Sequence, residues 1–163
     1  MFVQWLIFLH ILASVTFFLA HGASVAMAFK LRSETDLERI KALLDLSAST
    51  IGVLFLSFLA MGISGLVLPF FFNFWKTGWV WLSIVLTLFV FIWMVLINDK
   101  TYKKLRRLVG LPYMVMNKHF PAEPPASHEE IMAHIQSISV TQLMVIGYGV
   151  PTVILWLMTF KPF

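Results

Sequence analysis

SASTIGVLFLSFLAMGISGLVLPFFF, residues 47–72, contains no charged side chain. A helix needs about 20 apolar residues to cross the hydrocarbon core of a bilayer, and this stretch is long enough. Three further stretches have the same apolar character, at 2–29, 78–97 and 138–160. Since a backbone in lipid must satisfy its own hydrogen bonds, all four are expected to be helices. The sequence therefore predicts an all-α integral membrane protein, a single four-helix bundle over residues 1–163.

The composition agrees with a protein that is solvated by lipid. Hydrophobic residues make up 60% of the chain and charged residues 12%, far from the balance of a soluble domain. The absence of cysteine excludes disulfides, thiolate metal sites and iron–sulfur clusters. The net charge of +4 does not indicate nucleic-acid binding, because the basic residues lie where the apolar stretches end. The bilayer is the expected partner.

The basic residues predict the orientation of the chain in the membrane. Four of them lie in 30–46 and six in 98–137, whereas the short turn after Phe72 contains only Lys76. Lys and Arg are retained on the cytoplasmic side of membrane proteins. The first and third connections are therefore expected in the cytoplasm, and both termini on the outer side.

Two capping boxes predict that two helices begin before their apolar runs. Thr35 and Ser127 are each followed three residues later by a glutamate, Glu38 and Glu130, which is typical of a helix start. The expected helices therefore cover about 2–29, 36–72, 78–107 and 128–160. Glu130 is also expected to pair with His134, one turn further along a solvated segment.

Polar side chains share one face of the first predicted helix. His10, Ser14, Phe17, His21 and Ser24 follow each other at steps of three or four residues. The two histidines are about 16 Å apart along the axis, so one small cofactor could not touch both. Ionisable groups inside a membrane face the bundle interior and indicate function.

Counting turns from the membrane faces predicts which side chains lie near each histidine. Met61 and Ser64 fall near the level of His10, with Thr87 and Thr152, while Met94, Gln142 and Tyr148 fall nearer His21. Pro151 lacks an amide hydrogen, so the carbonyl of Gly147 is expected to be free for another partner.

Several kinds of chemistry are open to two buried histidines. They could ligate haem iron or another metal, relay protons, or form hydrogen bonds between helices. A four-helix bundle is a common host for haem held by His with a second His or Met. The residues that we consider for cofactor binding are therefore His10 as the metal ligand, with His21, Ser14, Met61, Met94 and Gln142.

Parts of the chain resemble a known family. The run LHILASV at 9–15, with Phe29–Arg32, resembles the first helix of the bacterial four-helix protoporphyrinogen oxidases, which are small haem-containing membrane proteins. The resemblance continues at Thr77–Val80, Tyr102–Leu105, Val150–Thr152 and Lys161–Phe163. The chain is also similar to the copper-resistance protein D family and to a related group that shares the first-helix histidine and a late glycine in the second helix, here Gly62 or Gly65.

This resemblance implies a haem-ligating role for His10 and a place in the bacterial cytoplasmic (inner) membrane. The oxidases also carry a lysine early in the third helix, where this chain reads WLSI at 81–84, and an acidic residue where Gly149 stands. Oxidation of porphyrinogens is therefore not expected. The sequence predicts a membrane-embedded b-type haem protein, redox-associated and possibly engaged in electron transfer, with a cofactor-free accessory subunit of a larger membrane complex as the alternative.

Overall fold

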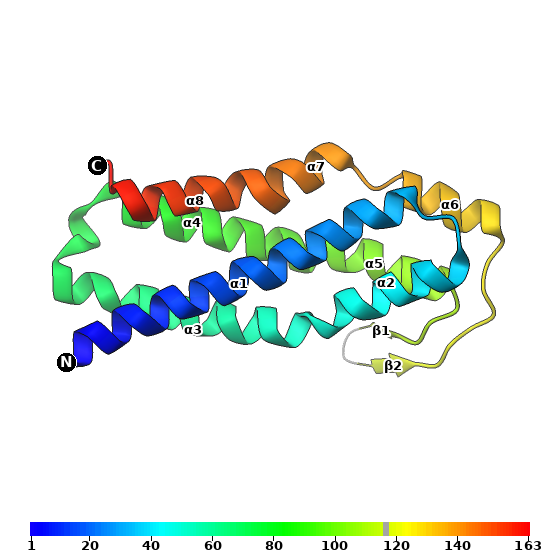
Figure 1. Ribbon diagram of the computed structural model, residues 1–163, viewed down its shortest axis with the longest axis horizontal. Helices are drawn as coiled ribbons and strands as arrows, with labels where there is room; N and C mark the ends of the chain where they lie inside the picture. The colour runs from blue at the N-terminus through cyan, green and yellow to red at the C-terminus, as the bar shows by residue number, and fades with distance from the viewer. Residues whose placement is uncertain (116–117) are drawn as a thin grey trace.

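Four long helical spans dominate the computed structural model, which describes residues 1–115 and 118–163 (Figure 1). Each is long and apolar enough to cross a membrane, and they cover Phe2–Ser33, Leu37–Phe72, Gly78–Leu108 and Val140–Phe160. Between 11% and 22% of the residues in their most apolar stretches are buried, so most apolar side chains face outward. The predicted all-helical architecture with four candidate membrane spans is confirmed.

The spans consist of shorter helical elements. The first is a single helix, α1 (Phe2–Ser33). The second joins α2 (Leu37–Ser49) to α3 (Ile51–Phe72), and the third joins α4 (Gly78–Trp93), the π-helical segment η2 (Met94–Asn98) and α5 (Asp99–Leu108). The fourth joins α7 (Val140–Met144), the π-helical segment η3 (Val145–Gly149) and α8 (Val150–Phe160). Between the spans lie η1 (Phe74–Lys76), an antiparallel pair of strands, β1 (Tyr113–Val115) and β2 (Lys118–Phe120), and α6 (His128–Gln136).

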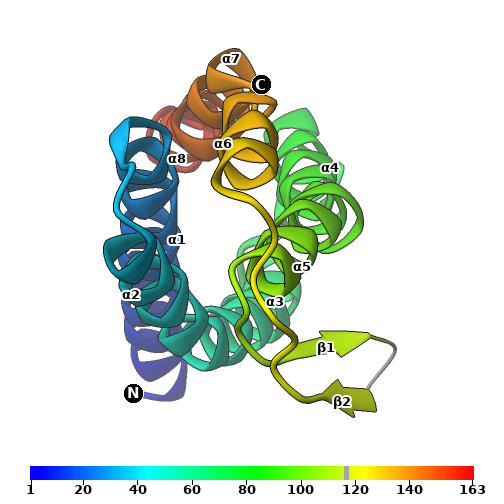
Figure 2. The ribbon, with the colours of Figure 1, turned by 90° about the vertical axis from the view of Figure 1, so that its right-hand side faces the viewer.

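The spans are arranged around a common centre (Figure 2). Helix α1 packs along α3, and α4 packs along α8. One end of the bundle, which we call the turn end, carries both chain termini and η1 (Figure 1). The other, the capped end, carries α2, α5, α6 and the strands (Figure 1).

The capped end has a compact apolar core of its own. Its members come from α1, α2, α5 and α6 and are almost fully buried: Leu31, Ile40, Leu44, Leu105, Val109, Ile131 and Ile135. Arg106 fastens α5 to α2, because its guanidinium lies 2.8 Å from the Asp45 carboxylate. Arg32 of α1 donates to the backbone carbonyl of Gln136 at 3.0 Å, which holds the end of α6. Within the capped end, α2 is therefore tied to α5, and α6 is tied to α1.

The predicted fourth helix is wrong in one respect. It was expected to run unbroken over 128–160, but it is interrupted after Gln136 and restarts at Val140. Ser139 forms a second cap, since its hydroxyl accepts a hydrogen bond from the amide of Gln142. The break falls in a mostly polar stretch, in which Ser139 and Gln142 have the spacing of a further capping box. The first helix also extends four residues beyond its predicted end, to Ser33.

The two predicted capping boxes have different outcomes. Ser127 caps α6 as expected, because its hydroxyl accepts a hydrogen bond from the amide of Glu130. The cap of α2 is Asp36 and not Thr35, with the carboxylate accepting from the amide of Arg39 at 2.9 Å. Asp is as good a cap as Thr, and the shift of one residue leaves Thr35 in the connection.

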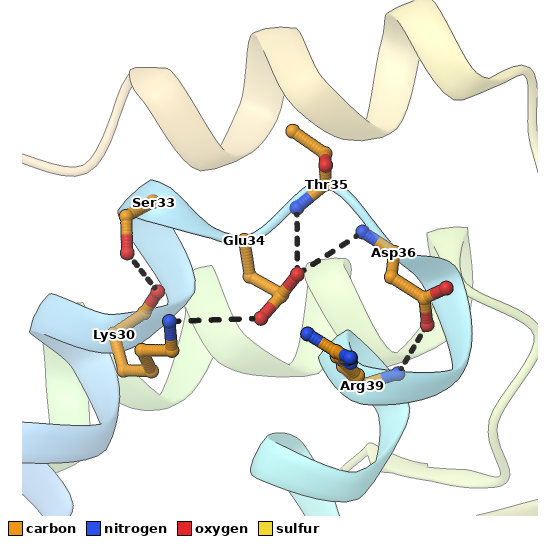
Figure 3. Close-up of polar contacts among 6 residues, drawn as sticks. All are labelled: Lys30, Ser33, Glu34, Thr35, Asp36 and Arg39. Atoms are coloured by element: carbon orange, nitrogen blue, oxygen red, sulfur yellow. Dashed lines mark hydrogen bonds and ion pairs between the residues drawn. The ribbon is translucent and has the colours of Figure 1, made fainter.

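Glu34 organises the connection between α1 and α2 (Figure 3). One oxygen of its carboxylate accepts hydrogen bonds from the amides of Thr35 at 3.1 Å and Asp36 at 3.3 Å. The other oxygen lies 3.8 Å from Nζ of Lys30. The amide of Asp36, then that of Thr35, Lys30 and Arg39 lower the pKa of Glu34 below its ordinary value of 4.5, against desolvation, which raises it.

We predict that this carboxylate makes stability depend on pH. Because folding lowers the pKa of Glu34, its stabilisation is present above the ordinary pKa of a glutamate and is lost as the pH falls through the folded value. Glu34→Gln should lower the melting temperature at neutral pH and flatten its decline in acid. Glu38→Gln, which removes an exposed carboxylate bound to Lys41, is the matched control and should keep that decline. If the melting temperatures of both variants fall equally with decreasing pH, the prediction is contradicted.

Candidate functional site

His10 of α1 is anchored to α3 through one ring nitrogen. Its Nδ1 lies 3.1 Å from the carbonyl oxygen of Met61 and 3.0 Å from Oγ of Ser64. The Ser64 hydroxyl donates its own hydrogen to the carbonyl of Ala60 at 2.6 Å. Since a carbonyl can only accept, we assign the ring proton to Nδ1. The turn count that placed Met61 and Ser64 beside His10 therefore agrees with the structure.

The second ring nitrogen of His10 carries the lone pair. Nε2 forms no hydrogen bond within the described part of the chain, and it is not among the buried atoms that lack a partner. His10 is only partly buried, so this atom is reachable from the surface of the bundle. A histidine that donates from one nitrogen to a carbonyl and presents the other is the usual arrangement of a metal ligand.

Gly65 makes room for the imidazole of His10. A Cβ atom at this position would lie 2.9 Å from Cε1 of His10, whereas one at Gly62 would meet nothing within 4 Å. The sequence alone did not decide whether Gly62 or Gly65 is the late glycine of the second helix that accompanies the first-helix histidine. The structure places Gly65 against the ring.

His21 lies on the same face of α1 but is anchored to a different span. Its Nε2 donates to the carbonyl of Gly147 in η3 at 3.1 Å, and its ring stacks on Phe17 with the centroids 5.8 Å apart. Pro151 lies four residues after Gly147 and has no amide hydrogen to offer that carbonyl. This carbonyl was expected to be available for another partner, and it accepts a hydrogen bond from His21.

The other nitrogen of His21 has no protein partner. Nδ1 is buried and forms no hydrogen bond in the part of the chain that the structure describes, and the whole residue is 4% exposed. With the proton on Nε2, Nδ1 carries a lone pair. His21 therefore differs from His10, whose free nitrogen is reachable from outside.

A cavity of about 120 Å³ lies beside His21 at the capped end. Met94 of η2 and Gln142 of α7, both predicted near His21, line it together with Thr101 of α5 and His134 of α6. The remaining lining residues are Val25, Trp93, Ser137, Ile138, Ser139, Leu143, Ile146 and Gly147. Two histidines from separate helices therefore share one cavity.

The centre of the bundle is filled by apolar side chains. A cavity of only about 10 Å³ remains where the four spans meet. Its lining comes from α1, α3, α4 and α8 and comprises Phe17, Phe18, Met61, Thr87, Val90, Pro151 and Ile154. Met61 thus contributes its carbonyl to His10 and its side chain to this packing.

One predicted site residue and one predicted ion pair have other contacts, and two residues of the cavity lining were missed. Ser14 donates to the carbonyl of His10 within α1 at 2.7 Å, so this bond joins no second helix. His134 does not pair with Glu130, because its Nε2 lies 3.0 Å from the carbonyl of Thr101. His134 and Thr101 were not expected near His21. The sign of this contact in the sequence is that His134 precedes Ile135, which belongs to the buried face of α6.

Comparison of the chain with family models, curated proteins and solved structures finds no match. The resemblance to the haem-containing oxidases therefore stays a prediction. Among the side chains that the structure describes, which exclude 97–99 and 115–117, no three His, Asp or Glu gather as a metal-binding group. What these two sites can do must be argued from their own geometry.

We predict opposite effects for alanine at the two glycines of α3. Gly65→Ala should destabilise the protein by about 1–3 kcal/mol, because the new methyl group pushes a ring that two hydrogen bonds hold in place. Gly62→Ala should be neutral or stabilising by up to ~1 kcal/mol, since the space is open and alanine favours a helix. Melting temperatures in mild detergent would measure both, and equal values would refute the close contact with His10.

Proposed function

We propose that this chain is a membrane-embedded, redox-associated protein with a b-type haem as its cofactor and His10 as an axial ligand. The observation that carries the proposal is the state of the His10 ring. Nδ1 is fixed by the carbonyl of Met61 and by Ser64, while Nε2 keeps a lone pair that can be reached from outside. A bound haem would supply one-electron chemistry, and these contacts would hold its ligand in orientation.

The enclosed spaces limit where such a haem could lie. Sites for small organic ligands usually measure about 300–1,000 Å³. The cavities at the bundle centre and beside His21 measure about 10 and 120 Å³, so neither holds a macrocycle. The donor chemistry of His10 fits a haem ligand, and its partial exposure supports a site at the bundle surface, against lipid or another subunit.

The second candidate function is a cofactor-free accessory subunit of a membrane complex. The filled centre of the bundle favours it, because Phe17, Met61, Val90 and Ile154 occupy the space that an internal cofactor would need. In that case the bonds of His10 to α3 and of His21 to η3 serve to hold helices together. Exposed apolar side chains on the spans would then contact partner helices as well as lipid.

For the orientation, we propose that the capped end faces the cytoplasm of a bacterial inner membrane and both termini face outward. The basic residues of the connections gather at the capped end, and Lys76 lies in η1 at the turn end. Cysteine at exposed Lys76 should react with a membrane-impermeant maleimide in intact cells, whereas cysteine at exposed Lys104 should react only after lysis. The reverse labelling pattern would overturn this orientation.

The haem proposal predicts a spectrum that depends on His10. Protein purified in mild detergent should show reduced-minus-oxidised haem bands, with extracted haem stoichiometric to the chain. His10→Ala should abolish them, because it removes the proposed ligand. His128→Ala, at an exposed position of α6, is the matched control and should leave them unchanged.

A featureless spectrum from folded wild-type protein would refute haem binding and favour the accessory subunit. That second function would in turn require the chain to migrate with other subunits in mild detergent. A lone, stable, haem-free monomer would contradict both.

A further inference from the structure

The cavity at the capped end combines features that the proposed haem site does not use. Its lining contains the buried His21 and further polar side chains from three other elements: Thr101, His134, Ser137, Ser139 and Gln142. Nδ1 of His21 has no hydrogen-bond partner within the described residues. A buried polar atom without a protein partner is usually satisfied by ordered water.

The size of the cavity suits water. A cavity needs only about 10–15 Å³ of open volume to hold one water molecule, so about 120 Å³ has room for several. Such a cavity must also offer polar partners, and the hydroxyl, amide and imidazole groups of the lining supply them. The exposed residues Ser137, Ser139 and Gln142 connect it to the surface of the capped end.

The helices around the cavity deviate from regular geometry at this level. Met94 belongs to the π-helical segment η2, and Gly147 belongs to the π-helical segment η3. Single π-helical turns inside α-helices are frequent at functional sites. Two of them, from different spans, border the same cavity, and the second supplies the carbonyl that fixes the ring of His21.

We propose that this cavity is a hydrated vestibule through which His21 exchanges a proton with the aqueous phase at the capped end. A hydronium ion in the cavity gives its proton to the lone pair on Nδ1. One N–H bond forms, one O–H bond breaks, and a neutral water molecule remains. Nε2 keeps its hydrogen on the carbonyl of Gly147 throughout, so the ring need not turn.

The groups that face His21 are few. His134 from α6 is the other titratable residue of the lining, and its Nε2 lies at the carbonyl of Thr101. Arg32 from α1 binds the carbonyls of Gln136 and Ile138 at the edge of the cavity. The described lining contains no carboxylate, so His21 is the group placed to accept a proton deepest in the cavity.

The proposal does not depend on haem, and its test reads His21 directly. The whole chain, labelled with ¹⁵N-histidine, is placed in lipid nanodiscs, and His21→Asn assigns the ring signals. The expected wild-type result at high pH is a proton on Nε2 alone with magnetisation transfer from water to the ring. Lowering the pH should reversibly shift Nδ1 to its protonated position. A ring that shows no water contact and no protonation while the fold persists would overturn the proposal.

Closing the mouth of the cavity gives a second, independent readout. Gln142→Trp places a large side chain at the mouth, and the backbone amide that binds Ser139 is kept. Met144→Trp, on the same helix but outside the lining, is the matched control. We expect loss of the water contact of His21 in the first variant and its retention in the second, at similar melting temperatures. Equal water contact in both would overturn the proposed route.

Discussion

The residue four positions after Gly147 is Pro151, which has no amide hydrogen to donate to the Gly147 carbonyl. A buried carbonyl needs another donor in place of the missing amide hydrogen. His21 does so from α1 at 3.1 Å, and much else follows from this contact. It ties α1 to the fourth span, fixes the proton on Nε2, and leaves Nδ1 with a lone pair beside a polar cavity.

His10 makes the same kind of contact, but its second nitrogen lies in a different environment. It too uses one nitrogen for the carbonyl of another helix, and Gly65 lets the ring approach closely. Its second nitrogen is reachable from the surface, whereas that of His21 is buried. A single polar stripe on α1 therefore carries two distinct environments. The free nitrogen of His10 can be reached from outside, while that of His21 is buried beside a polar cavity of about 120 Å³.

The sequence predicted the features that follow from the order of residue types within single helices. Apolar length identified the spans, turn counting placed Ser64 beside His10 and Gln142 near His21, and Pro151 indicated the free carbonyl. It did not predict what depends on contacts between distant segments. His134 reaches the carbonyl of Thr101 only because the chain breaks before Ser139 and turns α6 toward α5. The break has a local sign in the cap formed by Ser139, but the direction of α6 depends on packing at the capped end.

The cavity lies where two kinds of packing meet. On one side is the apolar core of the capped end, in which Ile135 and Leu105 are fully buried. On the other are spans whose apolar residues mostly face outward. Helices that leave the bundle to enter such a cap must change direction, and η2 and η3 lie at this level. Irregular backbone inside a membrane protein is tolerated where it is buried or lines a polar space. The position of the cavity is thus a consequence of joining a compact cap to a bundle whose apolar side chains mostly face outward.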